Sequence, residues 1–203
     1  MNQKIFILSK VVVSLAFSWA VLTAWVQFSD KAIEREFGAE NSGPQIQILF
    51  KADPIYNLDE QICMELSSVL EANGCRVLLS TYASEPPVSE ETDAIVFCAN
   101  TYNWAPDWAT QEFIRKNEHL KAKMAIAILL GSGSTYAARE IFENSISLRN
   151  MDLIGTEDFW LLRPNDETRL NEDNVAIARE QIKLKAQQWF DLIELKMKLN
   201  ASK

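Results

Sequence analysis

Histidine and cysteine are scarce in this chain of 203 residues, which contains one histidine and three cysteines. The cysteines, Cys63, Cys75 and Cys98, form no C-x-x-C pair, so a structural zinc site is not expected. The lone histidine, His119, lies in a polar run near an expected helix end, which leaves a serine hydrolase triad without its base. We therefore predict no metal ligand and no catalytic side chain.

Positive charge is also in short supply. The chain has 20 Lys and Arg against 28 Asp and Glu, a formal net charge of -8. With no basic stripe to neutralise phosphates, nucleic acid is not an expected partner. The length allows one domain with a sizeable core plus an appendage, but not a second full domain.

The appendage is an uncharged apolar run at residues 11–28, which as a helix would span about 27 Å. Lys10 precedes the run and Trp25 lies near its other end, where headgroups would suit both side chains. Small residues at Ser18 and Ala20 also fit a cleaved signal peptide. Because the run continues past Ala20 to residue 28, we favour a membrane anchor over residues 1–28, with the lipid bilayer as partner of 11–28.

Charges on the two sides of the run are nearly balanced. Lys4, Lys10 and the terminal amine on one side face Lys31 and Arg35 on the other. We predict a single-pass membrane protein, with a slight preference for an N-terminus in the cytoplasm.

Residues 29–44 are of mixed charge and end in the turn-forming cluster 41–44, Asn-Ser-Gly-Pro. We interpret 29–44 as a tether, with a short helix through Ile33 and Phe37, and 45–203 as the folded domain.

In that domain, apolar runs of strand length alternate with amphipathic stretches of helical length. The runs lie at 46–50, 75–81, 93–98, 124–130 and, as an interrupted pair, 152–154 with 159–162. This alternation predicts βαβ units and a parallel five-stranded α/β sheet. The runs at 93–98 and 124–130 are continuously apolar, as expected when helices cover both faces of a sheet.

The intervening stretches have helical spacing. In the first, Leu58, Ile62 and Leu66 share one face behind Asn57, the expected cap. Two more helices are expected, over 106–117 and from residue 134. The last is expected after residue 171, with an apolar stripe at three- and four-residue spacing. The stripe consists of Val175, Ala178, Ile182, Ala186, Trp189 and Ile193.

Ligands of such sheets bind beyond the carboxyl ends of the strands, which directs attention to the loops 51–57, 99–106 and 131–135. The run 98–106, Cys-Ala-Asn-Thr-Tyr-Asn-Trp-Ala-Pro, resembles the loop that lies beside the flavin ring in the flavodoxin family. The Gly-Ser-Gly-Ser turn at 131–134 resembles that family's turn after its fourth strand. Order and spacing extend the similarity over about 45–195, and the chain as a whole is similar to membrane-anchored flavodoxin-domain proteins of bacterial type.

The resemblance implies a flavodoxin-like doubly wound sheet with strand order 2-1-3-4-5, bound FMN, and electron transfer or an NAD(P)H/quinone-type oxidoreductase activity. A membrane redox partner or quinone is the implied partner. The implied cofactor-binding residues are Thr101, Tyr102, Asn103 and Trp104, then Gly131, Ser132, Gly133 and Ser134, with Asn57 in the phosphate loop.

The phosphate loop departs from the family pattern. Residues 51–57 contain no glycine, serine or threonine, and Pro54 offers no N–H. Asp53, Asp59 and Glu60 place carboxylates at the helix start, where they would repel a phosphate. Only Lys51 offers a positive charge that would attract one. An alternative therefore stays open, in which the fold is retained without flavin as a membrane-tethered interaction or assembly module.

Overall fold

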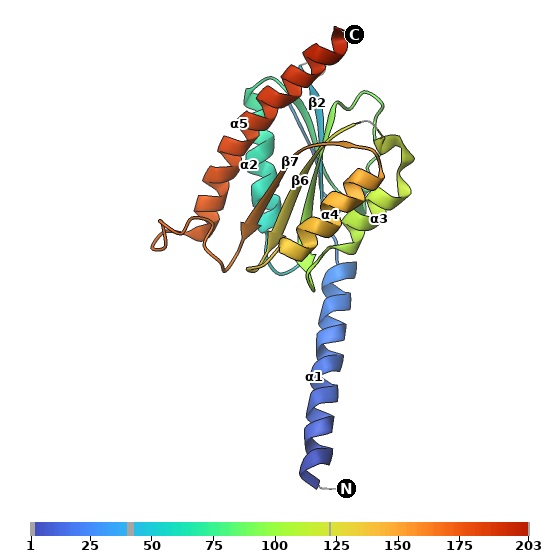
Figure 1. Cartoon of the computed structure of the whole chain (residues 1–203), viewed down its shortest axis with the longest axis vertical. Helices are drawn as coiled ribbons and strands as arrows, with labels where there is room; N and C mark the ends of the chain where they lie inside the picture. The colour runs from blue at the N-terminus through green and yellow to red at the C-terminus, as the bar shows by residue number, and fades with distance from the viewer. Residues whose placement is uncertain (1–2, 40–42, 122, 203) are drawn as a thin grey trace.

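The computed structural model describes residues 3–39, 43–121 and 123–202. Figure 1 shows a long helix, α1 (Gln3–Phe28), that projects from an α/β domain, while the C-terminal end of the chain lies at the opposite end of the molecule. The segment Ile7–Phe28 of α1 is long and apolar enough to cross a membrane.

The domain is built on a sheet that has, within the described residues, seven strands in the order β1-β3-β2-β4-β6-β7, with β5 (Ala105–Pro106) paired to β4. Five of them are parallel: β3 (Arg76–Thr81), β2 (Gln45–Phe50), β4 (Ala94–Tyr102), β6 (Met124–Gly131) and β7 (Asp152–Trp160). Numbered along the chain, these five have the order 2-1-3-4-5, which confirms the predicted fold and strand order.

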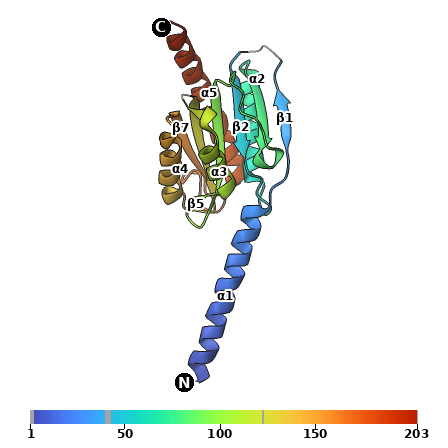
Figure 2. The same cartoon turned by 90° about the vertical axis from the view of Figure 1, so that its right-hand side faces the viewer.

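β1 (Glu34–Phe37) corrects the prediction of a short helix in the segment before the domain. It pairs antiparallel with β3, from Glu34 opposite Ser80 to Phe37 opposite Val77 (Figure 2). Without β1, β3 would be an open edge, and such an edge is a ready template for a further strand. Residues 34–37 are therefore part of the sheet.

β7 is continuous where an interruption was expected. The pairing with β6 continues to Trp160, with one register shift between Ala125 and Ile126. Most of β7 is only partly buried, because it forms the other edge of the sheet, and an edge strand tolerates polar side chains.

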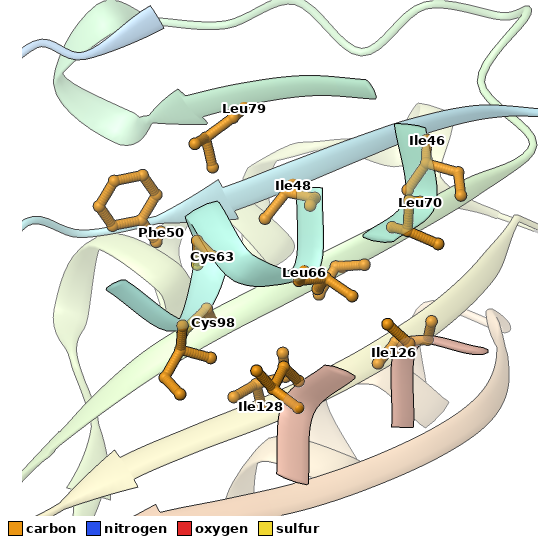
Figure 3. Packing of buried hydrophobic residues seen from close by; sticks show 14 of the residues in the cluster. Ile46, Ile48, Phe50, Cys63, Leu66, Leu70, Leu79, Cys98, Ile126 and Ile128 are labelled. Atoms are coloured by element: carbon orange, nitrogen blue, oxygen red, sulfur yellow. The ribbon is translucent and has the colours of Figure 1, made fainter. Parts of the chain in front are cut away.

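Helices cover both faces of the sheet, as Figures 1 and 2 show. On one face lie α2 (Leu58–Ala72) and α5 (Asn174–Ala201), and on the other α3 (Trp108–Lys116) and α4 (Tyr136–Leu148). Figure 3 shows Cys63, Leu66 and Leu70 of α2 lying over the buried side chains of the central strands. The cysteines are therefore small core residues.

The predicted stripe of the last helix is confirmed. Ala178, Ile182, Ala186, Trp189 and Ile193 are buried along α5. The helix begins later than expected, because the carboxylate of residue 173, an aspartate, accepts from the N–H groups of residues 175 and 176 and is the N-cap.

Candidate functional site

A cavity of about 270 Å³ lies beyond the carboxyl ends of β2, β4 and β6, at the point where the strand order reverses. Of the nine residues that the resemblance implies, five line it: Thr101, Tyr102, Asn103, Gly131 and Ser132. Trp104, Gly133, Ser134 and Asn57 are not among its lining residues. The loops after β4 and β6 therefore converge as expected, but only in part through the expected side chains.

Helix α1 forms one wall of this cavity, through Trp19, Leu22, Thr23 and Val26. Trp19 Nε1–H donates to Asn103 Oδ1 over 3.1 Å, and Asn103 Nδ2 donates to Thr23 Oγ1 over 3.3 Å. This wall was not predicted, since residues 11–28 were interpreted as a membrane anchor only. The available signal was polar side chains in the second half of an uncharged run, Thr23 and Gln27.

The end of α1 is also fixed to α3. The N–H of Trp108 donates to Gln27 Oε1 over 2.9 Å, and the rings of Phe28 and Trp108 meet edge to face with centroids 5.5 Å apart. Hydrogen bonds and aromatic packing therefore fix the end of α1 against the carboxyl edge of the sheet. A helix joined to the domain by its loop alone would not have such a fixed position.

The backbone N–H groups of the loop after β2 are bound by the chain's own carboxylates. Asp53 Oδ1 accepts from the N–H groups of Ile55 and Tyr56, at 2.7 and 2.9 Å. Tyr102 donates its hydroxyl to Asp53 Oδ2 over 2.5 Å. Loop N–H groups before a helix are the donors that hold a phosphate in other proteins, and here a carboxylate takes their place.

Asp59, in the first turn of α2, completes the arrangement. Its Oδ2 accepts from the N–H of Asp53 over 2.6 Å and from Asn100 Nδ2 over 3.0 Å, while its Oδ1 accepts from the N–H of Glu60 over 2.8 Å. Asn57 lies apart, exposed, and accepts from Gln61 Nε2. The residues present therefore do not fit the phosphate of FMN at this loop, because the N–H groups of residues 53, 55, 56 and 60 already donate to two carboxylates.

Lys51 does not compensate for these anions. Its side chain is fully buried, and its Nζ donates to the carbonyl oxygen of Ser29 over 2.6 Å, beyond the end of α1. Asp30, close by, accepts from the N–H of Ala52 over 3.0 Å. These contacts join the segment after α1 to the end of β2, so the lysine acts as a structural link.

Two buried carboxyl groups at this edge have raised pKa values. Burial raises the pKa of Asp59 to about 6, against the hydrogen bond from Asn100 that lowers it. Burial also raises the pKa of Asp107, the N-cap of α3, to about 6, although the N–H and hydroxyl of Thr110 donate to it. Both groups prefer the protonated form more than an exposed carboxyl does.

This preference predicts a pH dependence of stability. A raised folded-state pKa means that the folded chain binds the proton more tightly than the unfolded chain does. The added stability is therefore complete below the ordinary pKa near 4 and is lost as pH rises through about 6. We expect the free energy of unfolding of the full chain in detergent to be about 1–3 kcal/mol higher at about pH 5 than at about pH 7.5, measured by urea titration. Asp59→Asn should reduce the difference, whereas Asp166→Asn should not, because hydrogen bonds from Thr168 hold the pKa of the Asp166 carboxyl below its ordinary value. A stability that rises over this interval would contradict the assignment.

The turn between β4 and β5 has an unusual backbone. Tyr102 pairs with Ala105, and the two residues between them, Asn103 and Trp104, have φ angles of 51° and 62°. Two positive φ angles define a type I′ hairpin turn, which strongly favours glycine at its second position. Tryptophan there is strained, yet its side chain is 69% exposed.

Replacing Trp104 with glycine is expected to raise the free energy of unfolding by about 1 kcal/mol, because glycine adopts positive φ without the clash of a Cβ atom. Trp104→Ala keeps the Cβ atom and should give no such gain. Urea denaturation of the two variants in the same detergent measures the difference, and equal stabilities would show that the turn is not strained.

The turn after β6 is partly engaged by its neighbours. A Cβ atom on Gly131 would lie 2.9 Å from Thr135 Cγ2, so a larger residue there would force Thr135 to shift. The carbonyl oxygen of Ser132 accepts from the N–H groups of Leu162 and Arg163. Thr101 Oγ1, by contrast, is buried and has no hydrogen-bond partner among the described residues. It is a polar atom at the cavity that a ligand could satisfy.

A scan of the chain against protein-family models finds no match, and a search of curated proteins finds none. Solved structures do match. The rubredoxin oxygen:oxidoreductase of Desulfovibrio gigas has a TM-score of 0.55 and 14% identity, and the match covers 75% of this chain and 37% of that one. A flavone reductase has a TM-score of 0.52 and 15% identity, and the match covers 74% of this chain and 64% of that one. Megasphaera elsdenii flavodoxin has a TM-score of 0.50 and 13% identity, and the match covers 68% of this chain and 98% of that one. At such identities the likeness shows a shared fold, and that fold is flavodoxin-like.

Proposed function

We propose that this flavodoxin-like domain is held at a membrane by α1 and serves there as an interaction or assembly module, without FMN at the loop after β2. The observation that carries the proposal is the pair Asp53 and Asp59, whose carboxylates accept from the N–H groups that a phosphate would need. At a separation of about 4 Å, each like charge would oppose a phosphate by about 4 kcal/mol at intermediate dielectric.

The cavity itself supports this proposal. Its volume of about 270 Å³ is slightly below the roughly 300–1,000 Å³ of common small-molecule sites, and α1 supplies one wall. A domain whose anchor forms one wall of its ligand edge is suited to holding a fixed orientation at the membrane. Its partners would then meet the remaining faces.

The tether rests on the length and apolar composition of α1. Its polar residues near the domain, Thr23 and Gln27, are satisfied by contacts with the loop after β4 and with α3. Between Lys10 and Trp19 the helix exposes large apolar side chains, among them Val13, Leu15 and Phe17, as a membrane span does.

A second candidate is a membrane-anchored FMN protein that acts in electron transfer or as an NAD(P)H/quinone-type oxidoreductase. The observation that favours it is Thr101 Oγ1, which has no hydrogen-bond partner in the part of the chain that the structure describes and lies with Tyr102 and the turn at Gly131 around one cavity. In this alternative the bound flavin would supply the redox chemistry, and a quinone or membrane redox protein would be its partner.

Purification of the full chain in detergent tests the proposal. We expect a preparation without the visible absorption of flavin, and no saturable binding of FMN in a fluorescence titration. Co-purification of flavin in equal amount with the protein would overturn the first candidate in favour of the second. We also expect the chain to stay with membranes in carbonate, and its release would contradict the tether.

A further inference from the structure

The strained hairpin turn lies alongside α1, well before the helix ends. Trp19 and Thr23 both hydrogen bond to the side chain of Asn103, and Trp104 is the next residue of the turn. At 1.5 Å per residue, these contacts lie about 8–14 Å before Phe28 along the helix axis. The turn therefore reaches back along the candidate membrane span.

The length of α1 places this turn at the depth of the bilayer. The part of the candidate span before the contact, from Ile7 to Trp19, covers only about 18 Å, against roughly 30 Å for a hydrocarbon core. A bilayer crossed by α1 therefore needs the part of the helix that lies beside the turn. Whatever is exposed on the turn then meets lipid or the headgroup layer.

We propose that the turn of Asn103 and Trp104 is a second membrane contact, in which Trp104 inserts into the interfacial layer of the bilayer that holds α1. The inference rests on the proposed tether and adds a contact to it. Tryptophan is enriched at membrane interfaces, where its ring has both apolar and polar surroundings. A tryptophan with a positive φ and a largely exposed ring is unfavourable in water, at a position where glycine is preferred. Insertion of the ring into the bilayer would offset this cost.

Neighbouring side chains on the same edge fit a lipid surface. Ile55 and Tyr56, from the loop after β2, are exposed and line the same cavity as α1. Their apolar surface would extend the contact beyond the turn, while Asp53 Oδ1 is held within the loop by the N–H groups of Ile55 and Tyr56. The carboxyl edge of the sheet would thus rest on the membrane, with the C-terminal end of α5 directed away from it (Figure 1).

Fluorescence quenching in vesicles tests the contact. We would introduce single cysteines by Trp104→Cys, by Leu148→Cys and by Val13→Cys, and label each with an environment-sensitive dye. Leu148 is the matched control, because it is 83% exposed and apolar but ends α4 at the opposite edge of the sheet. The native cysteines are buried and would not compete for label in the folded chain.

The full-length variants would be placed in phosphatidylcholine vesicles that carry nitroxide at the headgroup, at a shallow acyl position or at a deep acyl position. We expect the dye at position 104 to be quenched several-fold more than the dye at 148. Equal quenching at 104 and 148, with the dye at 13 strongly quenched by deep nitroxide, would overturn the contact and leave the tether intact. An unquenched dye at 13 would instead refute the tether. Should Trp104→Cys fail to fold, Trp104→Phe answers the same question. Brominated lipid should quench less tryptophan fluorescence in this variant than in the unaltered chain, and equal quenching would overturn the contact.

Discussion

Replacing Trp189 with alanine is expected to lower the free energy of unfolding by about 3–5 kcal/mol, the range found when a large aromatic is removed from a core. Trp189 lies in the middle of α5 and is 5% exposed. Its indole fills the space above Gly155 of β7, where even a Cβ atom would collide with Trp189 Nε1. Urea denaturation of the full chain in detergent, followed by circular dichroism, measures the loss.

A double-mutant cycle separates this contact from a general loss of packing. Gly155→Ala alone should cost about 1–3 kcal/mol, because it overfills a close-packed contact. The same change should cost much less once Trp189 is alanine, since the space above β7 is then open. Additive effects, or a loss below about 1 kcal/mol for Trp189→Ala, would show that α5 does not dock through this side chain.

The docking of α5 could be predicted from the sequence because it depends on a local repeat. Buried positions at three- and four-residue spacing on a helix, and continuous apolar runs in parallel strands, are properties of short segments. The order of the five parallel strands followed from the family resemblance. β1 could not be found in this way, since four partly polar residues become a strand only by pairing with β3 from a distant part of the chain.

The location of the candidate site could be predicted from the sequence, but the contacts within it could not. The loops follow from the strand ends, and the unfavourable charge of Asp53 and Asp59 was visible in the sequence. Which donors these carboxylates would bind depends on the three-dimensional course of the loop. The wall contributed by α1 was hidden for the same reason, because the bond between Trp19 and Asn103 joins residues that are remote in the chain.

Changing Asp53 to serine is expected to improve FMN binding by roughly ten- to a thousandfold over the unaltered chain. The change removes a negative charge from the start of α2 and frees the N–H groups of Ile55 and Tyr56. Removing one like charge at about 4 Å is worth up to about 4 kcal/mol at intermediate dielectric, which sets the upper limit of the gain. Fluorescence titration of the full chain in detergent measures the affinity.

Riboflavin is the ligand control for this experiment, because it has the same ring as FMN but no phosphate. Its affinity should change little in Asp53→Ser, so the ratio of the two affinities isolates the charge effect. Asp152→Ser is the matched protein control, since it removes the same charge from an exposed position at the opposite edge of the sheet. An equal gain for both ligands would assign the effect to the ring pocket. Absence of binding by either ligand at millimolar concentration, in the unaltered chain and in Asp53→Ser alike, would eliminate the FMN alternative, because removing the opposing charge would then have exposed no latent flavin site.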